Sequence, residues 1–391
     1  MGTVVDSVTI RTYPAGIVIN NATGAIPEIQ QAGVLPTVCL HEILVFEEPL
    51  MRAAELIAPR TFRMAEMPEE GPGPGEVQVR VEAVGVCGSD LHAYSEGAVG
   101  STPNVYPMVL GHEPAGIVVK VGAGVTGLAE GDRGALEPAL YCYHCEFCLS
   151  GHHNVCANIR FLSNPGHPGF LRERVNLPAV NFLPIPLRMS FAEAALAEPL
   201  AIAMHSLRLV SIRPGETVAV IGAGPIGLMT IAALRASAAG RVWVVEPVPH
   251  RRELARVMGA NVALEPGEAA DAILHDTRRR GVDCAIDCAA GEHTTNLAIH
   301  LTRNAGRAAI TGIHSTPNVA LDGSAMRRKE LTIFNVRRSN HETHDALELL
   351  EAHAAWFAPV LTHTRPIEQI DEAFAIASQY RDGVGKMIVT P

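Results

Sequence analysis

The sequence predicts an α/β protein with a β-rich first domain and a second domain built on a parallel sheet. Between Arg52 and about Arg188, stretches such as Glu76–Glu82 alternate apolar and polar residues and are separated by glycine turns, which is typical of half-buried strands. From Thr217 onward, apolar strands alternate with helical stretches. This alternation indicates a parallel sheet with helices on both faces.

The elements follow this order along the chain. Glycine turns at Gly71–Gly75 and Gly131–Arg133 interrupt the strands of the first domain, and the Ala-, Leu- and Met-rich stretch Phe191–Val210 predicts a helix. The last strand could return to the first domain. The expected strands are Glu76–Glu82, Gly116–Gly122, Thr217–Ile221, Arg241–Glu246, Val282–Asp287, Arg307–Thr311 and Lys386–Thr390, and the later helices run from Gly227 to about Ala238 and over Arg251–Met258, His341–Ala355 and Glu368–Ser378.

Residues 1–50 stand apart from this pattern. They are mildly apolar, carry turn signals at Asn20-Asn21 and Gly24, and contain no recognisable chemical motif. Met51-Arg52 opens the strand pattern of the first domain. We interpret the first 50 residues either as a dispensable extension ahead of the natural start or as an added interface segment.

Length and composition limit the classes of function. The chain has 391 residues, enough for two or three domains, and its 48% hydrophobic and 18% charged content favours packed cores. The net charge is −10 and no basic face is apparent, so we expect no nucleic-acid partner. No apolar run approaches the roughly 18–20 residues that span a bilayer, and the N-terminus shows no signal peptide pattern. We therefore expect a cytoplasmic protein without a membrane partner.

Four of the eight cysteines form the strongest motif, Cys142-x2-Cys145-x2-Cys148-x7-Cys156. Four thiolates in one loop suit a closed, tetrahedral structural zinc site, and such a site is compatible with a reducing compartment. An iron–sulfur cluster is the rival interpretation, but the bacterial ferredoxin run needs its last cysteine after three residues, with proline following. Here the gap is seven residues and Ala157 follows.

A second motif, Gly222-Ala-Gly-Pro-Ile-Gly227, lies between an apolar strand and a helix. In this context the glycines allow a tight turn, a close approach of the backbone to a pyrophosphate, and packing of the helix on the strand. Glu246 is placed to bind the adenosine ribose hydroxyls, which favours NAD over NADP, whereas Arg251 and Arg252 leave NADP open. The cofactor-binding candidates are Gly222, Gly224, Pro225, Ile226, Gly227, Glu246 and Arg251.

A third motif is dispersed. Cys87, His112 and Glu113 would offer zinc one sulfur, one nitrogen and one oxygen ligand and leave the fourth position open, as catalytic zinc sites do. Each of these residues alone is more readily explained as a core cysteine, a turn histidine or a surface charge. Their occurrence with a four-cysteine loop and a dinucleotide turn in one chain favours the metal site.

Together these motifs resemble the zinc-containing medium-chain dehydrogenases, most closely the sorbitol (polyol) dehydrogenase branch. The resemblance extends from about Arg52 to Pro391, and the order of its motifs is highly specific. The motifs are Gly85-Val-Cys-Gly-Ser-Asp-Leu-His92, Gly111-His-Glu113, Gly131-Asp-Arg133, Glu137-Pro138, the four-cysteine loop ending in Asn154-Val-Cys156, Arg160-Phe161, Ala197-Glu-Pro-Leu200 and Gly222–Gly227.

The resemblance implies a GroES-like catalytic domain in two segments, 51–198 and 337–391, with a Rossmann domain over 199–336 inserted between them. It implies that Cys87, His112 and Glu113 hold a catalytic zinc, with Glu198 bound to it directly or through water. It also implies a proton relay through Ser89 and His92, substrate binding or water orientation by Arg337, and a dimer or tetramer joined partly through the edge of the Rossmann sheet.

Three positions depart from the polyol branch. Ala93 and Arg338 stand where the branch usually has tyrosine, although Tyr94 follows one residue later. Leu162 stands where an aromatic residue often lines the substrate pocket. These differences affect the identity of the substrate and leave the metal and cofactor motifs intact.

The expected function is reversible transfer of a hydride from a secondary alcohol, a polyol or sugar alcohol, to NAD⁺, with two zinc ions per chain. The same reaction on threonine or an aryl alcohol is the alternative within this enzyme class. A non-catalytic nucleotide-binding homologue is the alternative outside it, and the retention of every zinc ligand argues against that alternative.

Overall fold

The computed structural model describes residues 9–13, 16–20, 49–291 and 293–391, and the chain divides into two compact units, Met1–Glu47 and Glu48–Pro391. In the first unit, β1 (Thr9–Tyr13) pairs antiparallel with β2 (Gly16–Asn20). The turn signals at Asn21 and Gly24 lie outside the described residues. Both interpretations of the N-terminal extension therefore stay predictions.

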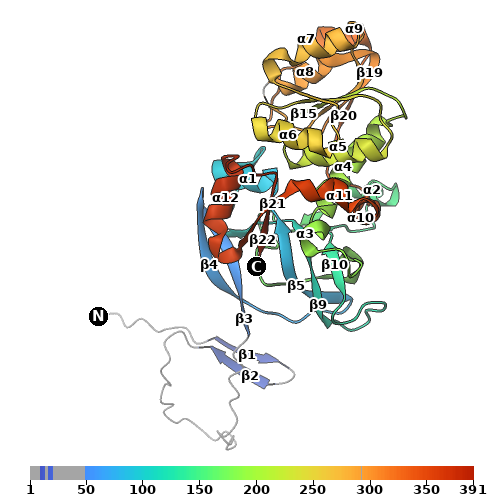
Figure 1. Ribbon diagram of the computed structural model, residues 1–391. Coiled ribbons are helices and arrows are strands. Elements are labelled where there is room, and N and C mark those ends of the chain that lie inside the picture. Colours follow the sequence, from blue (N-terminus) through green and yellow to red (C-terminus); the bar gives the residue numbers. More distant parts are fainter. Residues whose placement is uncertain (1–8, 14–15, 21–48, 292) are drawn as a thin grey trace, which may run out of the picture. The chain divides into compact units, whose positions relative to one another are not determined.

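A seven-stranded mixed sheet organises the β-rich part of the second unit (Figure 1). Its order is β14-β10-β9-β5-β22-β21, and β13 pairs with β5 outside this path. The final strand β22 pairs antiparallel with β5, so the end of the chain completes the first sheet. The bounds are β5 (Glu76–Gly85), β9 (Glu113–Val121), β10 (Arg133–Leu136), β13 (Arg174–Pro178), β14 (Phe182–Pro184), β21 (Leu361–Pro366) and β22 (Lys386–Thr390).

Smaller elements surround this sheet. A core of valines from β5 packs with Phe170, Leu171 and Phe374, and the last of these residues lies on α12. The remaining strands are β3 (Leu50–Ala58), β4 (Thr61–Pro68), β6 (Ala98–Val99), β7 (Thr102–Pro103), β8 (Met108–Val109), β11 (Ala139–Leu140) and β12 (Arg160–Phe161). The helices are α1 (Gly88–Glu96), α2 (Glu146–Leu149) and α12 (Ile370–Ser378), with 3₁₀ turns η1 (His153–Val155), η2 (Ala179–Asn181), η3 (Ala358–Val360) and η4 (Ile367–Gln369).

The second sheet is parallel throughout and has the order β17-β16-β15-β18-β19-β20. The strand order reverses direction between β15 and β18, and ligands bind outside the carboxyl ends of the strands at such a point. This is the doubly wound sheet that the sequence predicts. The bounds are β15 (Val218–Ile221), β16 (Val242–Val245), β17 (Val262–Leu264), β18 (Val282–Asp287), β19 (Thr302–Ile310) and β20 (Thr332–Asn335).

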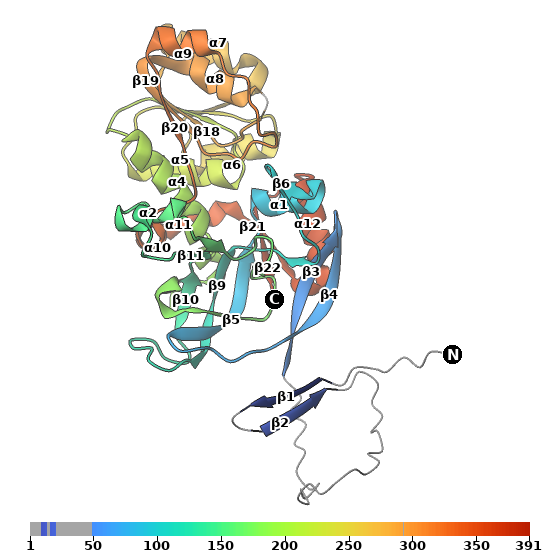
Figure 2. The same ribbon diagram turned by 180° about the vertical axis from the view of Figure 1, so that it is seen from behind.

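Helices cover both faces of the parallel sheet, as Figures 1 and 2 show. Val218 and Val220 face α4, α5 and α6, while their neighbours Ala219 and Ile221 face α7 and α8. This alternation follows from the period of two along a strand. The helices of this part are α4 (Ala197–Val210), α5 (Pro225–Ala236), α6 (Pro249–Met258), α7 (Pro266–Asp276), α8 (Thr294–Leu301) and α9 (Gly323–Lys329). The remaining helices are α3 (Phe191–Ala194), α10 (Thr343–Ala352) and α11 (Ala354–Phe357).

The predicted helix over Phe191–Val210 is in fact two helices, α3 and α4. Pro199 has no N–H to donate to the carbonyl of Ala195, so the regular ladder cannot run through this point. Leu196 N instead donates to Glu193 O at 3.0 Å, which is the tighter spacing of a turn. The break puts Glu198 in the first turn of α4.

Candidate active site

A cavity of about 540 Å³ brings the dispersed motifs together within the second unit. Residues from the β-rich part and from the carboxyl ends of the parallel strands both line it. Gly227 and the four cysteines of the loop do not line it. The sequence-predicted residues that line the cavity are Cys87, Ser89, His92, His112, Glu113, Glu198, Gly222, Gly224, Pro225, Ile226, Glu246, Arg251 and Arg337.

Cys87, His112 and Glu113 converge at one wall of the cavity. Cys87 caps the N-terminus of α1, and Glu113 is the first residue of β9. One potential ligand atom from each of the three residues lies within 4.8 Å of the others. Glu113 Oε1 is buried without a hydrogen-bond or ion-pair partner among the described groups. A bound metal explains such an orphaned atom, and this sulfur, nitrogen and oxygen set suits an open zinc site.

Asp90 supports this group and was not singled out from the sequence. It is buried, and its carboxylate accepts hydrogen bonds from Cys87 N at 3.1 Å and Gly111 N at 3.2 Å. Its Oδ1 also lies 3.3 Å from His112 Nδ1. A carboxylate behind a histidine ligand orients the imidazole toward a metal. The signal in the sequence is an aspartate at the third position of the helix that Cys87 caps.

We expect Asp90→Asn to lower zinc affinity at this group by roughly 10- to 100-fold, because the imidazole and two backbone N–H groups lose a charged acceptor. Zinc affinity would be measured by competition with a chelator. Asp132→Asn is a matched control, since Asp132 also accepts a backbone hydrogen bond, from Ala129, far from the cavity. Equal zinc affinity in Asp90→Asn and the native protein would contradict a positioning role.

Glu113 also forms a buried ion pair with Lys386, the first residue of β22. Lys386 Nζ donates a second bond to Val86 O at 2.9 Å. Gly85 leaves the space for this pair, because a Cβ there would lie 2.1 Å from Glu113 Oε2. The returning strand therefore places a cation against one of the candidate metal ligands.

Glu198 lies in the same cavity but outside the group of three ligand atoms that approach within 4.8 Å. Its Oε2 is buried and has no hydrogen-bond partner among the described groups. Burial raises the pKa of Glu198 to about 8, and the charges of Glu113 and Glu137 act in the same direction. Whether this carboxyl group binds the metal directly stays a prediction.

Ser89 and His92, the residues of the predicted proton relay, both line the cavity. Ser89 Oγ lies 3.3 Å from His112 Nε2, and His92 Nδ1 lies 2.8 Å from Glu96 Oε1. No direct hydrogen bond joins Ser89 to His92 among the described side chains. A relay between them therefore requires a bridging group in the cavity, such as a ribose hydroxyl.

The glycine turn follows β15 directly and opens α5. Gly222 has φ of +92°, a conformation that favours glycine. A Cβ at Gly227 would lie 2.0 Å from Gly222 O, so glycine is required there for the helix to approach the turn. Gly224 forms the N-cap, and Pro225 occupies the first helical position, where its missing N–H has no cost. This geometry is that of a pyrophosphate-binding turn.

Glu246 and Arg251 lie beside this turn. Glu246 is buried, and its two oxygens accept bonds from Ala223 N at 2.7 Å and Val248 N at 2.9 Å. The Arg251 guanidinium stacks over the Tyr380 ring, 3.9 Å from its centroid, and its Nε is buried without a partner among the described groups. Arg252 is instead paired with Glu265. Of the two adjacent arginines, Arg251 lines the cavity and Arg252 does not.

The pocket lining differs from the expectation at two positions. Tyr94 does not replace the tyrosine that Ala93 lacks, because its ring packs in the core against Phe62 and Phe374. Leu162 does not line the cavity, whereas the aromatic residue that precedes it, Phe161, does. Arg338 stacks over the Phe161 ring, 3.8 Å from its centroid.

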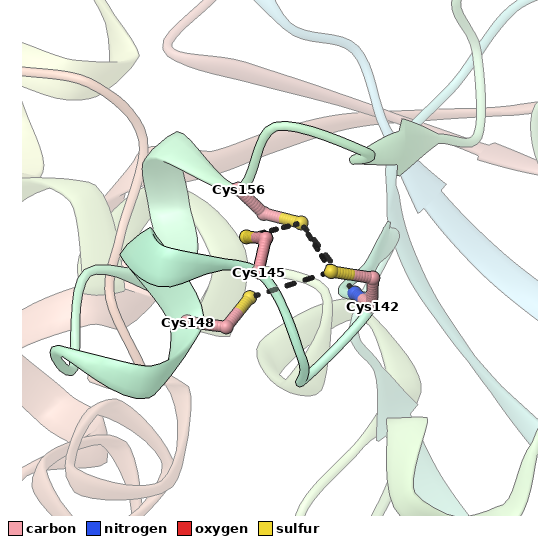
Figure 3. A group of neighbouring side chains, drawn as sticks. All are labelled: Cys142, Cys145, Cys148 and Cys156. Carbon is pink, nitrogen blue, oxygen red and sulfur yellow. Dashed lines mark hydrogen bonds between the residues drawn. The ribbon is translucent and has the colours of Figure 1, made fainter.

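The four cysteines of the loop converge on one point, as Figure 3 shows. Their sulfurs are separated by 3.4 Å between Cys156 and Cys142 and by 3.9 Å for both the Cys142–Cys148 and Cys145–Cys156 pairs. Zinc–sulfur bonds of 2.3 Å in a tetrahedron place sulfurs about 3.8 Å apart. The spacing therefore fits a closed zinc site and is far too long for disulfides.

Comparisons with known proteins agree with this description. Residues 73–187 match the family model of the alcohol dehydrogenase GroES-like domain, and residues 225–352 match that of the zinc-binding dehydrogenases. Sorbitol dehydrogenase of Bacillus subtilis (strain 168) is 32% identical over 343 residues, which covers 87% of this chain and 97% of the relative. The described part of the chain contains no helix that is both long and apolar enough to span a bilayer.

Two solved structures with bound cofactors are also similar. An alcohol dehydrogenase of E. coli CFT073 in complex with NADH has a TM-score of 0.80 at 28% identity. The match covers 88% of the present chain and 99% of the E. coli chain. A zinc-binding dehydrogenase of Sinorhizobium meliloti 1021 bound to NADP has a TM-score of 0.79 at 28% identity. The match covers 88% of the present chain and 100% of the dehydrogenase chain.

Fold, cavity and relatives together define an oxidoreductase that binds zinc and acts on the CH–OH group of its donor. The chain belongs to the zinc-containing medium-chain dehydrogenase family, in its sorbitol (polyol) dehydrogenase-like branch.

Proposed function

We propose that this enzyme catalyses the reversible, NAD-dependent oxidation of a secondary alcohol of a polyol or sugar alcohol to a ketone. One observation carries the proposal: the buried Cys87, His112 and Glu113 group and the glycine turn of a dinucleotide site line the same cavity. The similarity to a sorbitol dehydrogenase supports the polyol class of substrate.

Each of the candidate site residues would have a defined role in this reaction. When bound, zinc supplies a Lewis acid to the substrate hydroxyl, and NAD supplies the hydride acceptor. Cys87, His112 and Glu113 would hold the metal, and Glu198 lines the same cavity. Ser89 Oγ would take the hydroxyl proton, which would pass through a bridging group in the cavity, such as a ribose hydroxyl, to His92 Nε2. His92 is suited to this task because its side chain is 33% exposed and its Nδ1 is already bound by Glu96.

We propose a second zinc in the four-cysteine loop and NAD as the preferred cofactor. Glu246 supports NAD because a buried carboxylate at this position disfavours a 2′-phosphate. Arg251 is the specific feature that favours NADP, since its guanidinium lines the cavity. The ratio of kcat/KM for NAD and NADP would decide between them.

We also propose the division into catalytic segments 51–198 and 337–391 around a dinucleotide domain at 199–336. The return of β22 to β5 supports it. A dimer or tetramer through the edge of the parallel sheet and a cytoplasmic location complete the proposal. The edge strand β20 pairs only with β19 among the described strands.

The proposal is tested with a panel of polyols, sugar alcohols, threonine and aryl alcohols, by following cofactor reduction at its near-ultraviolet absorbance. We expect turnover of polyhydroxy substrates, loss of turnover after removal of zinc, and two zinc ions per chain by elemental analysis. Turnover restricted to threonine or aryl alcohols would replace the substrate class. Cofactor binding without turnover of any alcohol would contradict the enzyme function.

A further inference from the structure

Two adjacent arginines, Arg337 and Arg338, line the cavity that contains the candidate metal ligands. They follow the carboxyl end of β20, on the side of the sheet where ligands bind. Within residues 49–291 and 293–391, neither guanidinium has a carboxylate within ion-pair distance or donates a hydrogen bond to another group. The cavity therefore has cationic side chains that the described protein does not neutralise by direct pairing.

Arg338 is the more buried of the two arginines, and its backbone adopts a left-handed conformation. Its φ is +53°, a left-handed conformation that is rare for residues other than glycine and is concentrated at functional sites. Its guanidinium lies flat on Phe161, and Nη1 is buried without a partner. Burial lowers the pKa of Arg338 to about 10, and Arg337 acts in the same direction, so the group stays charged near neutral pH.

The segment that carries these arginines is hydrogen bonded to the four-cysteine loop, residues 142–156. Asn154 Nδ2 donates to Arg337 O at 2.9 Å, and Asn340 exchanges hydrogen bonds with His153 N at 3.0 Å and Gly151 O at 2.8 Å. The backbone of this segment is therefore anchored before a substrate arrives, and the Arg338 guanidinium is also stacked on Phe161. Preorganised donors lose less conformational entropy when they bind a ligand.

Nearby carboxylates do not account for Arg338. The carboxyl groups that act on its charge are Glu198 and Glu137. Glu137 is already hydrogen bonded to Thr343 Oγ1 at 2.7 Å and to Ala139 N at 3.2 Å. Glu198 lies outside ion-pair distance of Arg338. The buried Nη1 of Arg338 is thus left for a ligand.

We propose that Arg338, together with Arg337, binds an anionic group on the substrate, so that the enzyme prefers a polyhydroxy acid or a phosphorylated polyol to a neutral polyol. This inference rests on the proposed function and specifies its substrate class. A guanidinium presents paired N–H donors that match a carboxylate or a phosphate, and a buried charge without a partner is unfavourable until one binds.

The test compares native enzyme with Arg338→Met and Arg338→Lys on sorbitol, D-gluconate and sorbitol 6-phosphate. We expect the native enzyme to prefer one of the anionic substrates. Arg338→Met should then lose roughly 10- to 100-fold in kcat/KM on that substrate, mainly through KM, and change little on sorbitol. Arg338→Lys keeps the charge and should recover part of the loss. Gluconate and the phosphate ester distinguish a carboxylate site from a phosphate site.

Binding is measured separately from turnover. The enzyme–NADH complex would be titrated calorimetrically with D-gluconate, inorganic phosphate and sorbitol, so that the pyrophosphate site is already filled. Binding of an anion should weaken in Arg338→Met and stay unchanged in Arg63→Met, which removes an exposed charge paired with Glu55.

The outcomes separate the two proposals. Equal effects of Arg338→Met on neutral and anionic ligands, or anion binding that does not depend on Arg338, would overturn the anion site even if sorbitol is oxidised. Arg338-dependent anion binding without oxidation of any alcohol would support the site and reject the dehydrogenase function.

Discussion

Cys87→Ala is expected to reduce kcat by roughly 10³-fold or more, because several kilocalories per mole of Lewis-acid stabilisation are lost with the metal. Zinc content should fall from two ions per chain to one. Binding of NADH should change little, because the glycine turn and Glu246 lie on the parallel sheet and not on α1. The measurements are initial rates, elemental analysis and fluorescence titration with NADH.

A matched control for this variant is Cys284→Ala, which removes a buried thiol of β18 outside both cysteine-containing metal groups. It should keep both zinc ions and most of the activity. Substantial turnover by Cys87→Ala, or retention of two zinc ions, would show that Cys87 is not a ligand of the catalytic metal.

Cys148→Ser is expected to remove the other zinc ion and to lower the melting temperature by roughly 10 °C, since folding of a small zinc lobe depends on its metal. Cys148 is buried in the lobe, and its sulfur lies 3.9 Å from that of Cys142. The lobe holds the loop of Arg337 and Arg338 through Asn154 and His153. We therefore also expect a higher KM for the alcohol, with little change in KM for the cofactor.

Thermal unfolding, zinc analysis and steady-state kinetics test this second prediction, again with Cys284→Ala for comparison. If Cys148→Ser kept both zinc ions and an unchanged melting temperature, the four-cysteine loop would not be a structural metal site. An increase in KM for the cofactor alone would show that the lobe does not position the substrate side of the cavity.

Local patterns made much of the fold predictable. The period of two in Glu76–Glu82 anticipated β5, and the predicted strands Val282–Asp287 and Lys386–Thr390 coincide with β18 and β22. The helices α7, α8 and α9, which connect the strands from β17 to β20, were not predicted from the sequence. Tertiary packing against that sheet supports these short helices, whereas local periodicity alone marks them weakly.

The candidate site was predictable where its residues form motifs and not where they meet through folding. The spacing of the four cysteines and the Gly222–Gly227 turn are local, so their geometry is encoded within a few residues. Asp90 lies within its motif, yet its contact with His112 depends on the fold that brings α1 next to the segment before β9. Its position in the helix that Cys87 caps is the local signal, but the histidine that it contacts is 22 residues further along the chain.

By itself, the sequence determined the two kinds of sheet, the set of potential zinc ligands and the dinucleotide turn, because periodicity, ligand type and glycine spacing are properties of short segments. Only the tertiary structure decided that Lys386 pairs with Glu113, and that Arg338 lies on Phe161 in the cavity of the metal group. These contacts join residues that are more than 150 positions apart. Chain topology, and not local preference, brings them together.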